Sequence, residues 1–540
     1  MIAHCPASGP LRRGVPALWL GLCAAILAAM RGASHPADLP PIVFVSRQPA
    51  GGADAGQIPG LGPHGSTIAV GGRLLLRTRD GLVRELLPPG ALYDVQDPDV
   101  SWDAKRVVFS GLATRTGHWR LYVLKLATGK FECITADTQP PNMMQDDFDP
   151  CWNGERIVFA RASGGARSLY DTSRVAALFE WRARAGEAQF VLSEANGVLD
   201  PVIDTRRGTL LFSRWWFNPW LPRAEGGVTR DASEAMTRDT VNQWQLIETA
   251  PGAGAFVDAQ RLTPVAGARL RAGGVPDRRA GMGVQPALVG DAIVATYARN
   301  AGLAPTPGPT GVHLMRGAPS AGLRLAGAAI GDDLANPYSE GSGLSAPTAC
   351  APAALPDGRL IVSFAAGARG DFGLWLLGLD GTRTLVHDTP GTLELDAAPV
   401  VERAGTPLQL NAVRAGSAER SMRERMETAP GTFRFLDEDV FRGRGAPRRQ
   451  SGARLRFLAL GSSRNDTTSP RIIAEVAIPR RGRIDLRLKP QGPLFEQLVD
   501  ANGRVLMSAH GPAQVRGFNT PPAGTEARCL GCHLGHSALR

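Results

Sequence analysis

The sequence predicts an all-β protein: a β-propeller of six blades, with seven as the alternative, followed by a small β-sandwich-like domain. Two observations lead to this prediction. A strand–turn–strand unit recurs through residues 38–405, and a second hairpin lies between successive copies. From residue 406 the pattern changes to short strands with alternating side chains. Two hairpins per repeat make a four-stranded antiparallel sheet, which is the unit of a propeller.

The repeat is clearest in DVSWDAKRVVFSG (99–111) and DPCWNGERIVFAR (149–161), which superimpose without a gap. Trp102 then falls on Trp152, and Asp103 falls on Asn153. Fainter copies begin at residues 200, 285, 351 and 396. Each gives a short apolar strand and a tight turn, and all but the last continue into a β-branched strand. We expect PIVFVSR (41–47) to complete the ring, whereas residues 66–87 would supply a partial unit if there are seven blades.

The second hairpins are predicted at residues 118–135 and 371–388, around ATGK and LDG. Residues 213–239 interrupt the period and carry four aromatic side chains, Trp215, Trp216, Phe217 and Trp220. Such a group favours a packed cluster under a long loop. The alternative is the wall of a binding funnel or a contact with the C-terminal domain. Gly- and Pro-rich residues 263–282 and 302–345 are expected to form rim loops.

Residues 406–527 are expected to form the small β domain, with the turn signal Asn502-Gly503 in its last hairpin. A Pro- and Gly-rich arm, residues 511–528, leads to the chain end. At the other end, Arg12 and Arg13 precede an apolar run from Val15 to Met30, and small residues follow. This order is typical of a secretory signal peptide, which we place at residues 1–34. The mature protein is therefore expected in the periplasm, without a membrane span.

The tail, residues 528–540, contains CLGCH, in which Cys529, Cys532 and His533 have the C-x-x-C-H spacing of c-type haem attachment. Two thiols at this spacing can each form a thioether with one haem, and the following histidine becomes an axial iron ligand. A zinc site would need two further ligands, and a redox C-x-x-C remains the other alternative. We therefore expect one covalent haem c, with His533 as the metal ligand.

The second axial ligand is left open by the sequence. His510 is the first candidate, because the arm that follows it is long enough to fold the haem beneath it. Met507 is the second. His536 lies about one helical turn from His533 and on the same face, so it cannot reach the opposite side of the ring. Two imidazoles would keep the reduction potential low, and methionine would raise it.

Charge and cysteine content exclude several classes. The formal net charge is +10, and the leader contributes three arginines, so the mature chain is near +7. The basic residues are scattered apart from one cluster at 441–456, which does not indicate nucleic-acid binding. A basic surface could steer an acidic redox partner protein. Cys133, Cys151 and Cys350 remain after the leader and the haem peptide; Cys133 and Cys151 could pair, but unpaired buried thiols are favoured. Asp146, Asp147 and Asp149 could suggest calcium, although their neighbours match a blade turn.

The repeat D-x-x-W-[DN]-[AG]-x-R-[VI]-V-F resembles that of TolB-type propellers. Together with AEVAIPRRGRIDLRL…PLFEQLVDANGRVL and the terminal C-x-G-C-H, the chain resembles the hydrazine synthase alpha-subunit family over roughly residues 40–533. That resemblance implies a middle propeller and a C-terminal haem domain. The family's catalytic haem lies in an N-terminal domain that this chain lacks, so hydrazine synthesis is not implied, and the haem that remains looks like the electron-transfer one.

The leading hypothesis is an exported mono-haem c-type cytochrome-like protein that transfers electrons, with the propeller as a docking platform for a partner or small substrate. The alternative is a TolB-like binding scaffold in which the haem is structural or sensory. Catalytic residues are not indicated, and any enzyme activity would be that of an oxidoreductase subunit. A propeller-associated hydrolase is excluded, because no G-x-S-x-G nucleophile motif occurs.

Overall fold

The structure is a computed structural model of the chain. It describes residues 39–135, 145–168, 174–183, 186–193, 196–218, 220–223, 227–230, 241–249, 260–261, 283–297, 310–316, 323–327, 348–365, 371–410, 413–414, 432–442, 446–459, 470–489, 494–508, 511–514 and 526–529. Within these ranges, strands dominate, and the helices are one turn of α-helix and one 3-10 turn. The prediction of an all-β propeller fold is confirmed. The predicted leader and most of the predicted rim loops lie outside the described residues. The rim-loop prediction for 302–345 is wrong at Gly311–Arg316 and Leu323–Gly327, which form two strands of a blade.

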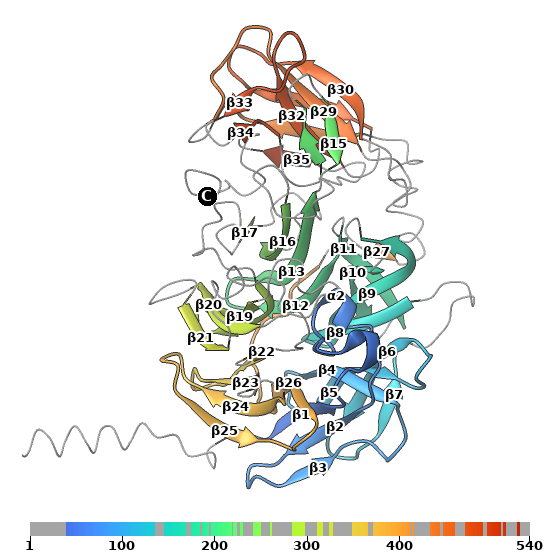
Figure 1. Cartoon of the computed structure of the whole chain (residues 1–540). Coiled ribbons are helices and arrows are strands. Elements are labelled where there is room, and N and C mark those ends of the chain that lie inside the picture. The colour runs from blue at the N-terminus through green and yellow to red at the C-terminus, as the bar shows by residue number, and fades with distance from the viewer. Residues whose placement is uncertain are drawn as a thin grey trace, which may run out of the picture.

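Six antiparallel sheets follow one another around a central channel (Figure 1). Blade 1 holds β1 (Ile42–Arg47), β2 (Gly72–Arg77) and β3 (Val83–Glu85), and blade 2 holds β4 (Asp94–Val100), β5 (Arg106–Leu112), β6 (Trp119–Lys125) and β7 (Phe131–Cys133). Blade 3 holds β8 (Gln145–Asn153), β9 (Arg156–Arg167), β10 (Arg174–Arg182) and β11 (Glu187–Ser193), and blade 4 holds β12 (Val198–Asp204), β13 (Thr209–Asn218), β16 (Val241–Thr249) and β17 (Gln260–Arg261). Blade 5 holds β18 (Gly283–Val289), β19 (Ala292–Tyr297), β20 (Gly311–Arg316) and β21 (Leu323–Gly327), and blade 6 holds β22 (Thr348–Ala354), β23 (Leu360–Ala365), β24 (Gly373–Leu377) and β25 (Arg383–His387).

The ring is closed by β26 (Leu393–Pro399), which pairs with β1 and becomes the innermost strand of blade 1. Residues 41–47 therefore meet the end of the repeat, as the sequence predicts. Residues 72–77 and 83–85 form the outer strands of this same blade, so they do not start a separate unit. Joining the first and last strands of the repeat in one sheet stabilises the ring, because opening it breaks a full ladder of hydrogen bonds.

Blades 2 and 3 are locked together by two indoles. Trp102 Nε1 donates to the carbonyl of Trp152 at 3.1 Å, and Trp152 Nε1 donates to the carbonyl of Asp99 at 3.1 Å. The two tryptophans are therefore not equivalent. In blade 2 the second strand pairs with the innermost strand at Ser110 and Gln96. The equivalent pair in blade 3 is Ala160 and Phe148. The offset between the blades is therefore 50 residues in the second strand but 52 in the innermost strand. The predicted gap-free superposition is correct for the second strands and wrong for the innermost ones, because the hairpin turn of blade 2 is two residues longer.

After β26 the chain forms a strap, residues 400–410 followed by β27 (Val413–Arg414). The Arg403 guanidinium bonds the Asp99 carboxylate at 3.0 Å. Further on, the side-chain amide of buried Asn153 accepts from the Leu408 N–H at 2.8 Å and donates to the Leu408 carbonyl at 2.9 Å. β27 then adds a fifth strand to the outer edge of blade 3. The strap therefore fastens the closed ring to blades 2 and 3.

We expect Asn153→Asp to lower the free energy of unfolding by about 1–3 kcal/mol, since the carboxylate cannot donate to the Leu408 carbonyl and would be buried beside Glu180. The matched control is Asp103→Asn, which keeps the acceptor for the Lys105 N–H at a partly exposed turn and should cost less than about 0.5 kcal/mol. Urea unfolding followed by tryptophan fluorescence measures both. Equal costs would contradict this role of Asn153.

The C-terminal domain has two three-stranded sheets, one in the order β31 (Ile484–Leu488), β28 (Phe433–Asp437), β35 (Glu526–Cys529) and the other in the order β30 (Arg471–Ala477), β29 (Arg454–Ala459), β32 (Leu494–Val499), with a short pair β33 (Met507–Ser508) and β34 (Gly511–Pro512). Its core is built on phenylalanines such as Phe435 and Phe457, whose rings meet edge to face at 4.9 Å. In Figure 1 this domain stands beyond the tip of blade 4.

The insertion in blade 4 reaches into that domain. It forms the hairpin β14 (Trp220–Pro222) and β15 (Val228–Arg230), and Trp220 and Val228 are buried in the C-terminal core. The amide of Gln514 donates to the Trp220 carbonyl at 2.8 Å. Trp215 instead stacks on Trp244 inside the propeller, with ring centroids 5.7 Å apart. Trp215 thus belongs to a packed cluster, and Trp220 makes the contact with the C-terminal domain; the side chains of Trp216 and Phe217 lie outside the described ones.

Candidate functional site

One residue from the innermost strand of each blade faces the central channel, and each has positive φ, between 48° and 53°. These six, called the ring residues below, are Asp97, Asp149, Asp200, Gln285, Ala351 and Asp396. Each sits in a β-bulge, where the pairing with the second strand skips two residues. A bulge frees its extra residue from the ladder and turns its side chain. Asp tolerates the left-handed conformation better than most residues do.

The ring residues are joined by hydrogen bonds from blade to blade. The Asp149 N–H donates to Asp97 Oδ2 at 3.3 Å, the Asp200 N–H to Asp149 Oδ2 at 3.1 Å, and the Gln285 N–H to Asp200 Oδ2 at 2.8 Å. The series continues from the Ala351 N–H to Gln285 Oε1 at 3.0 Å, and the Asp97 N–H lies 3.5 Å from Asp396 Oδ2. Ala351 has no side-chain acceptor, so the series is interrupted beside the closing strand β26.

Burial disfavours the charged form of these carboxyls. Burial first, and then neighbouring ring carboxyls, raise the pKa values of Asp97 and Asp149 well above the ordinary value for aspartate. Burial also raises the pKa of Asp200, and it raises the pKa of Asp396 to about 6. Because the folded state binds these protons more tightly than the unfolded chain does, their contribution to stability is complete below about pH 4. It is lost as the pH rises through the folded-state pKa values.

Asp396→Asn is therefore expected to raise the free energy of unfolding by about 1–3 kcal/mol above pH 6 and to have little effect at pH 4. Asparagine keeps the acceptor for the Asp97 N–H and tolerates positive φ. Asp396→Ala removes the same charge together with the acceptor, so it should gain less. Thermal unfolding from pH 4 to pH 8 checks this, and parallel pH profiles for Asp396→Asn and the wild type would contradict it.

The ring residues line an open cavity of about 150 Å³, together with the residue that follows each of them, which is proline in five blades. Among the described residues, no group of three or more histidine, cysteine, aspartate or glutamate side chains is arranged to hold a metal ion. Asp147 instead forms a buried pair with Arg161 at 2.7 Å, and Asp146 bonds Arg174 and the Trp119 N–H. Asp146, Asp147 and Asp149 lie in strand β8 rather than in the predicted blade turn, and they face different partners.

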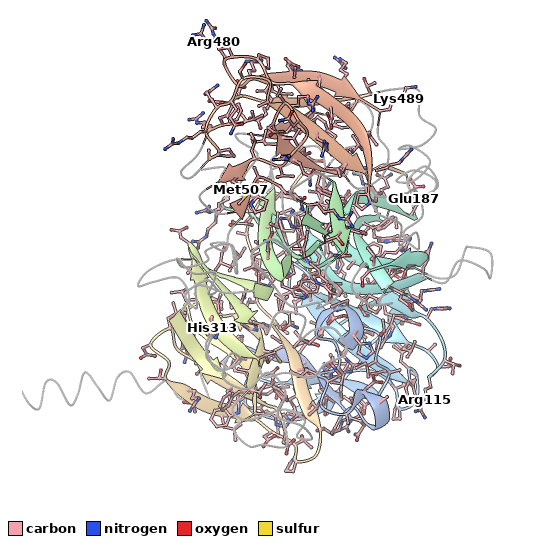
Figure 2. All side chains as sticks on the ribbon, turned by 45° about the horizontal axis from the view of Figure 1, so that its top comes forward. Arg115, Glu187, His313, Arg480, Lys489 and Met507 are labelled. Carbon is pink, nitrogen blue, oxygen red and sulfur yellow. The ribbon has the colours of Figure 1, made fainter. Side chains whose placement is uncertain are left out.

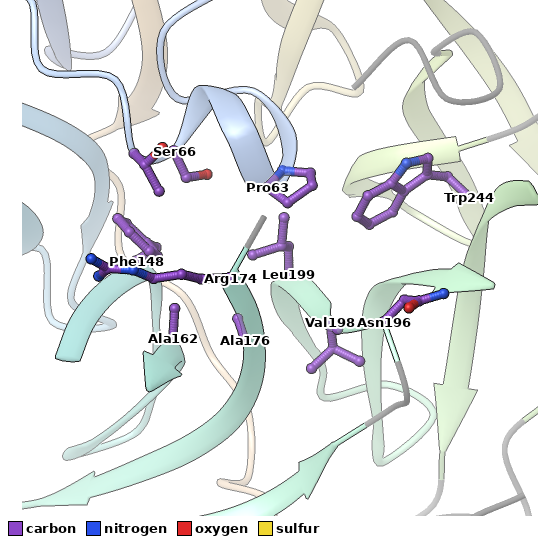
Figure 3. A pocket seen from close by; sticks show the side chains of 12 residues that line it. Pro63, Ser66, Phe148, Ala162, Arg174, Ala176, Asn196, Val198, Leu199 and Trp244 are labelled. Carbon is purple, nitrogen blue, oxygen red and sulfur yellow. The ribbon is translucent and has the colours of Figure 1, made fainter. Parts of the chain in front are cut away.

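A plug formed by residues 48–71 of the β1–β2 connection closes the other end of the channel; it contains a 3-10 turn, η2 (Gly52–Asp54), and the short helix α2 (Gly62–Gly65). Figure 3 shows Pro63 and Ser66 of the plug above Phe148, Arg174 and Leu199 of blades 3 and 4. The space that they enclose is about 10 Å³, enough for about one water molecule. The plug therefore packs closely against blades 3 and 4 at this place.

Of the predicted haem residues, only Cys529 lies within the described residues. It ends β35, an edge strand that pairs in parallel with β28, and its partner across that pairing is buried Asp437. Cys532, His533, His510 and His536 lie outside the described residues. Met507, in β33, is 64% exposed. The first residues of the predicted arm are packed in the domain: Ala513 is buried, and Gln514 bonds Gln497 at 2.6 Å.

The three remaining cysteines are free thiols, as the sequence predicts. Cys151 and Cys350 are buried and Cys133 is partly buried. Burial raises the pKa of Cys151 to about 12 and the pKa of Cys350 well above the ordinary value, so neither is a reactive thiolate. Thiol chemistry in this chain is therefore expected at the tail.

No protein-family profile and no curated protein matches the sequence. A chain of hydrazine synthase from Kuenenia stuttgartiensis is similar in structure, with a TM-score of 0.59 at 14% identity over 93% of this chain and 70% of that chain. The two chains share a fold. TolB from Acinetobacter baumannii gives a TM-score of 0.38 at 14% identity, over 70% of each chain. At such identities the likeness concerns the fold alone. Within the described residues, no helix is long and apolar enough to cross a membrane.

Proposed function

We propose that this is an exported protein that carries one covalent c-type haem on Cys529 and Cys532 and exchanges electrons through it with a partner protein. The observation that carries the proposal is the C-x-x-C-H spacing in a chain that begins with a signal-peptide pattern. Two thiols and an imidazole suit haem attachment chemically, and a haem bound there would supply one-electron transfer.

The position of Cys529 supports this proposal. β35 is fixed along the edge of a sheet by four backbone pairings with β28, from Arg434↔Glu526 to Asp437↔Cys529. The attachment peptide begins directly after this anchored strand. A haem on the next residues would thus be tied to the C-terminal domain rather than to the channel. In this proposal His533 would hold the iron on one side, and the opposite ligand would be His510, the first candidate, or Met507, the second.

The propeller, in this proposal, is a rigid platform for the partner or for a small molecule. The plug, the strap and the blade-to-blade ring bonds all stiffen it. Periplasmic location follows from the leader at residues 1–34. Hydrazine synthesis is not proposed, since the chain has one attachment motif only.

Absorption spectra of protein expressed with haem-maturation machinery test the proposal. If His533 and His510 both bind the iron, we expect a six-coordinate low-spin spectrum in both oxidation states and no change with carbon monoxide. His510→Ala should convert the haem to a form that binds carbon monoxide, whereas His536→Ala should not. A high-spin ferric spectrum in the wild type would overturn the ligand assignment, and absence of haem would overturn the function.

A further inference from the structure

Beyond the predicted leader, the net positive charge of this protein lies in the C-terminal part of the chain. Residues 39–431 contain 39 arginines and lysines against 40 aspartates and glutamates, a net charge of −1. Residues 432–540 contain 18 against 9, a net charge of +9. The propeller is thus nearly neutral, and the part of the chain that ends in the haem peptide is strongly basic.

Part of this surplus lies along one edge of the domain, where residues 471–489 carry six cationic side chains against two acidic ones. β30 and β31 are edge strands of their sheets and are joined by a turn at residues 478–483. The strands and the turn together form what we call the basic edge, whose exposed cationic side chains are Arg471, Arg480, Arg481, Arg483, Arg487 and Lys489. Figure 2 shows Arg480 projecting from the tip of the domain, with Lys489 on the same domain. At about 3.3 Å per residue, each strand makes the edge some 20 Å long.

The two acidic residues of this edge, Glu475 and Asp485, pair with arginines of β29 and β28, and the edge's Arg483 pairs with Glu438 outside it. Asp485 pairs with Arg434 at 2.6 Å, and Glu438 pairs with Arg483 at 3.1 Å. Glu475 pairs with Arg456 at 2.6 Å. In the described part of the chain, no acidic side chain forms an ion pair with Arg480, Arg481, Arg487 or Lys489. All four of these cations are exposed.

The turn presents its arginines rigidly. The Gly482 N–H donates to the Pro479 carbonyl at 2.8 Å, and the Val440 N–H donates to the Gly482 carbonyl at 3.0 Å. Gly482 has a φ of 79°, and a Cβ there would lie 2.0 Å from Asp439 Oδ1, so only glycine fits. A second hydrogen bond, from Arg449 Nη1 to the Arg480 carbonyl at 2.9 Å, fixes the tip. Rigid presentation lowers the entropy lost on binding.

The basic edge also lies close to the proposed haem peptide. Asp437 of β28 is paired with Ile484 on one side and with Cys529 on the other. Since neighbouring strands are about 4.8 Å apart, the backbone of Cys529 lies about 10 Å from that of Ile484, the first residue after the turn. Arg481 and Arg483 therefore flank the place where the attachment peptide leaves the sheet.

From this juxtaposition we infer that the basic edge is the docking surface for an acidic redox protein that exchanges electrons with the haem. The inference rests on the proposed function and adds the location and charge of its partner. Charged side chains on edge strands also prevent edge-to-edge aggregation, but either sign of charge does that. A surplus of one sign beside the haem peptide is what steers an oppositely charged partner. Ile472, 51% exposed on β30, offers an apolar contact within the same edge.

The test uses the haem-loaded full-length protein and a plant-type [2Fe–2S] ferredoxin as the acidic probe. We expect Arg480→Glu/Arg481→Glu to slow haem reduction by reduced ferredoxin about tenfold or more at low ionic strength and to flatten its salt dependence. Arg84→Glu/Arg115→Glu makes the same change of charge on exposed propeller residues and should alter the rate less than twofold. Reduction by dithionite, a small reductant, should be unaffected in both variants.

The other possible results distinguish a wrong docking surface from a wrong haem function. Equal slowing in the two double variants would mean that net charge alone matters, and the docking surface would be wrong while the haem function stands. If the wild type carries no haem, the proposed function is wrong. The basic edge can then still be tested by measuring with calorimetry how tightly ferredoxin binds the wild type and the two double variants. Binding of the wild type to phosphatidylglycerol vesicles, lost in Arg480→Glu/Arg481→Glu with no effect on ferredoxin, would replace the protein partner with a membrane surface.

Discussion

Replacing Arg47 with methionine is expected to lower the free energy of unfolding by about 3–5 kcal/mol, the largest effect on stability that we predict for one side chain. Arg47 is fully buried at the end of β1. Its guanidinium bonds both oxygens of buried Asp94, at 3.1 and 2.8 Å, and also Gln96 Oε1 and the Ile68 carbonyl, each at 2.9 Å. One side chain thus joins blade 1, blade 2 and the plug.

Methionine fills a similar volume but leaves the Asp94 carboxylate buried without its counter-ion. The control is Arg106→Met, which removes an equally short pair with Glu155, a residue that is 78% exposed. That change should cost about 1 kcal/mol, since solvent screens exposed pairs. Arg47→Met/Asp94→Leu should recover part of the loss, because it removes the unpaired charge. Chemical denaturation measures all three, and similar costs for Arg47→Met and Arg106→Met would contradict this account of the plug.

The second large effect is on the haem. Cys529→Ala/Cys532→Ala is expected to abolish covalent haem and electron transfer completely, while the melting temperature of the propeller stays within a few degrees of the wild type. Only the edge strand β35 reaches the attachment peptide, and no blade packs on it in the described residues. Haem staining after denaturing electrophoresis and calorimetric unfolding measure the two quantities. Cys133→Ala, at a partly buried thiol in blade 2, is the matched control and should retain all haem.

The same variant separates the two functional hypotheses. If the protein is an electron carrier, the haem-free variant should still bind the acidic probe at the basic edge but should not be reduced by it. If the haem organises the C-terminal domain as a structural group, the variant should lose probe binding and the cooperative unfolding of that domain together. The second result would favour the scaffold hypothesis over electron transfer.

Much of the fold was predictable because its strands carry local signals. The alternating residues of 118–135 and 371–388 become β6 with β7 and β24 with β25, as expected. The closing role of residues 41–47 also followed from their apolar strand pattern. The register of the innermost strands was harder to predict. Trp102 and Trp152 align in the sequence, but they occupy different places in their blades. The alignment needs no gap, so it does not reveal that the hairpin turn of blade 2 is two residues longer than that of blade 3.

The ring residues were not predicted, because their role depends on blades meeting across the channel. In the sequence, Asp149 is one of three neighbouring acidic residues. Its role, which is to accept a hydrogen bond from the Asp200 N–H of the next blade, is seen only in the folded structure. A signal was nevertheless present: an acceptor or small residue before proline recurs as Asp-Pro, Asp-Pro, Asp-Pro, Gln-Pro and Ala-Pro at the start of five innermost-strand bulges. The entry of Trp220 into the C-terminal core likewise required tertiary structure.

The most direct test of the central claim is the mass of the last tryptic peptide, residues 529–540, which begins directly after Arg528. Protein recovered from the periplasm of a host with haem-maturation enzymes should yield this peptide carrying the mass of one haem, with neither thiol open to alkylation. The bare peptide, with both cysteines alkylated, would contradict the assignment and leave a propeller joined to a basic β domain without a redox centre.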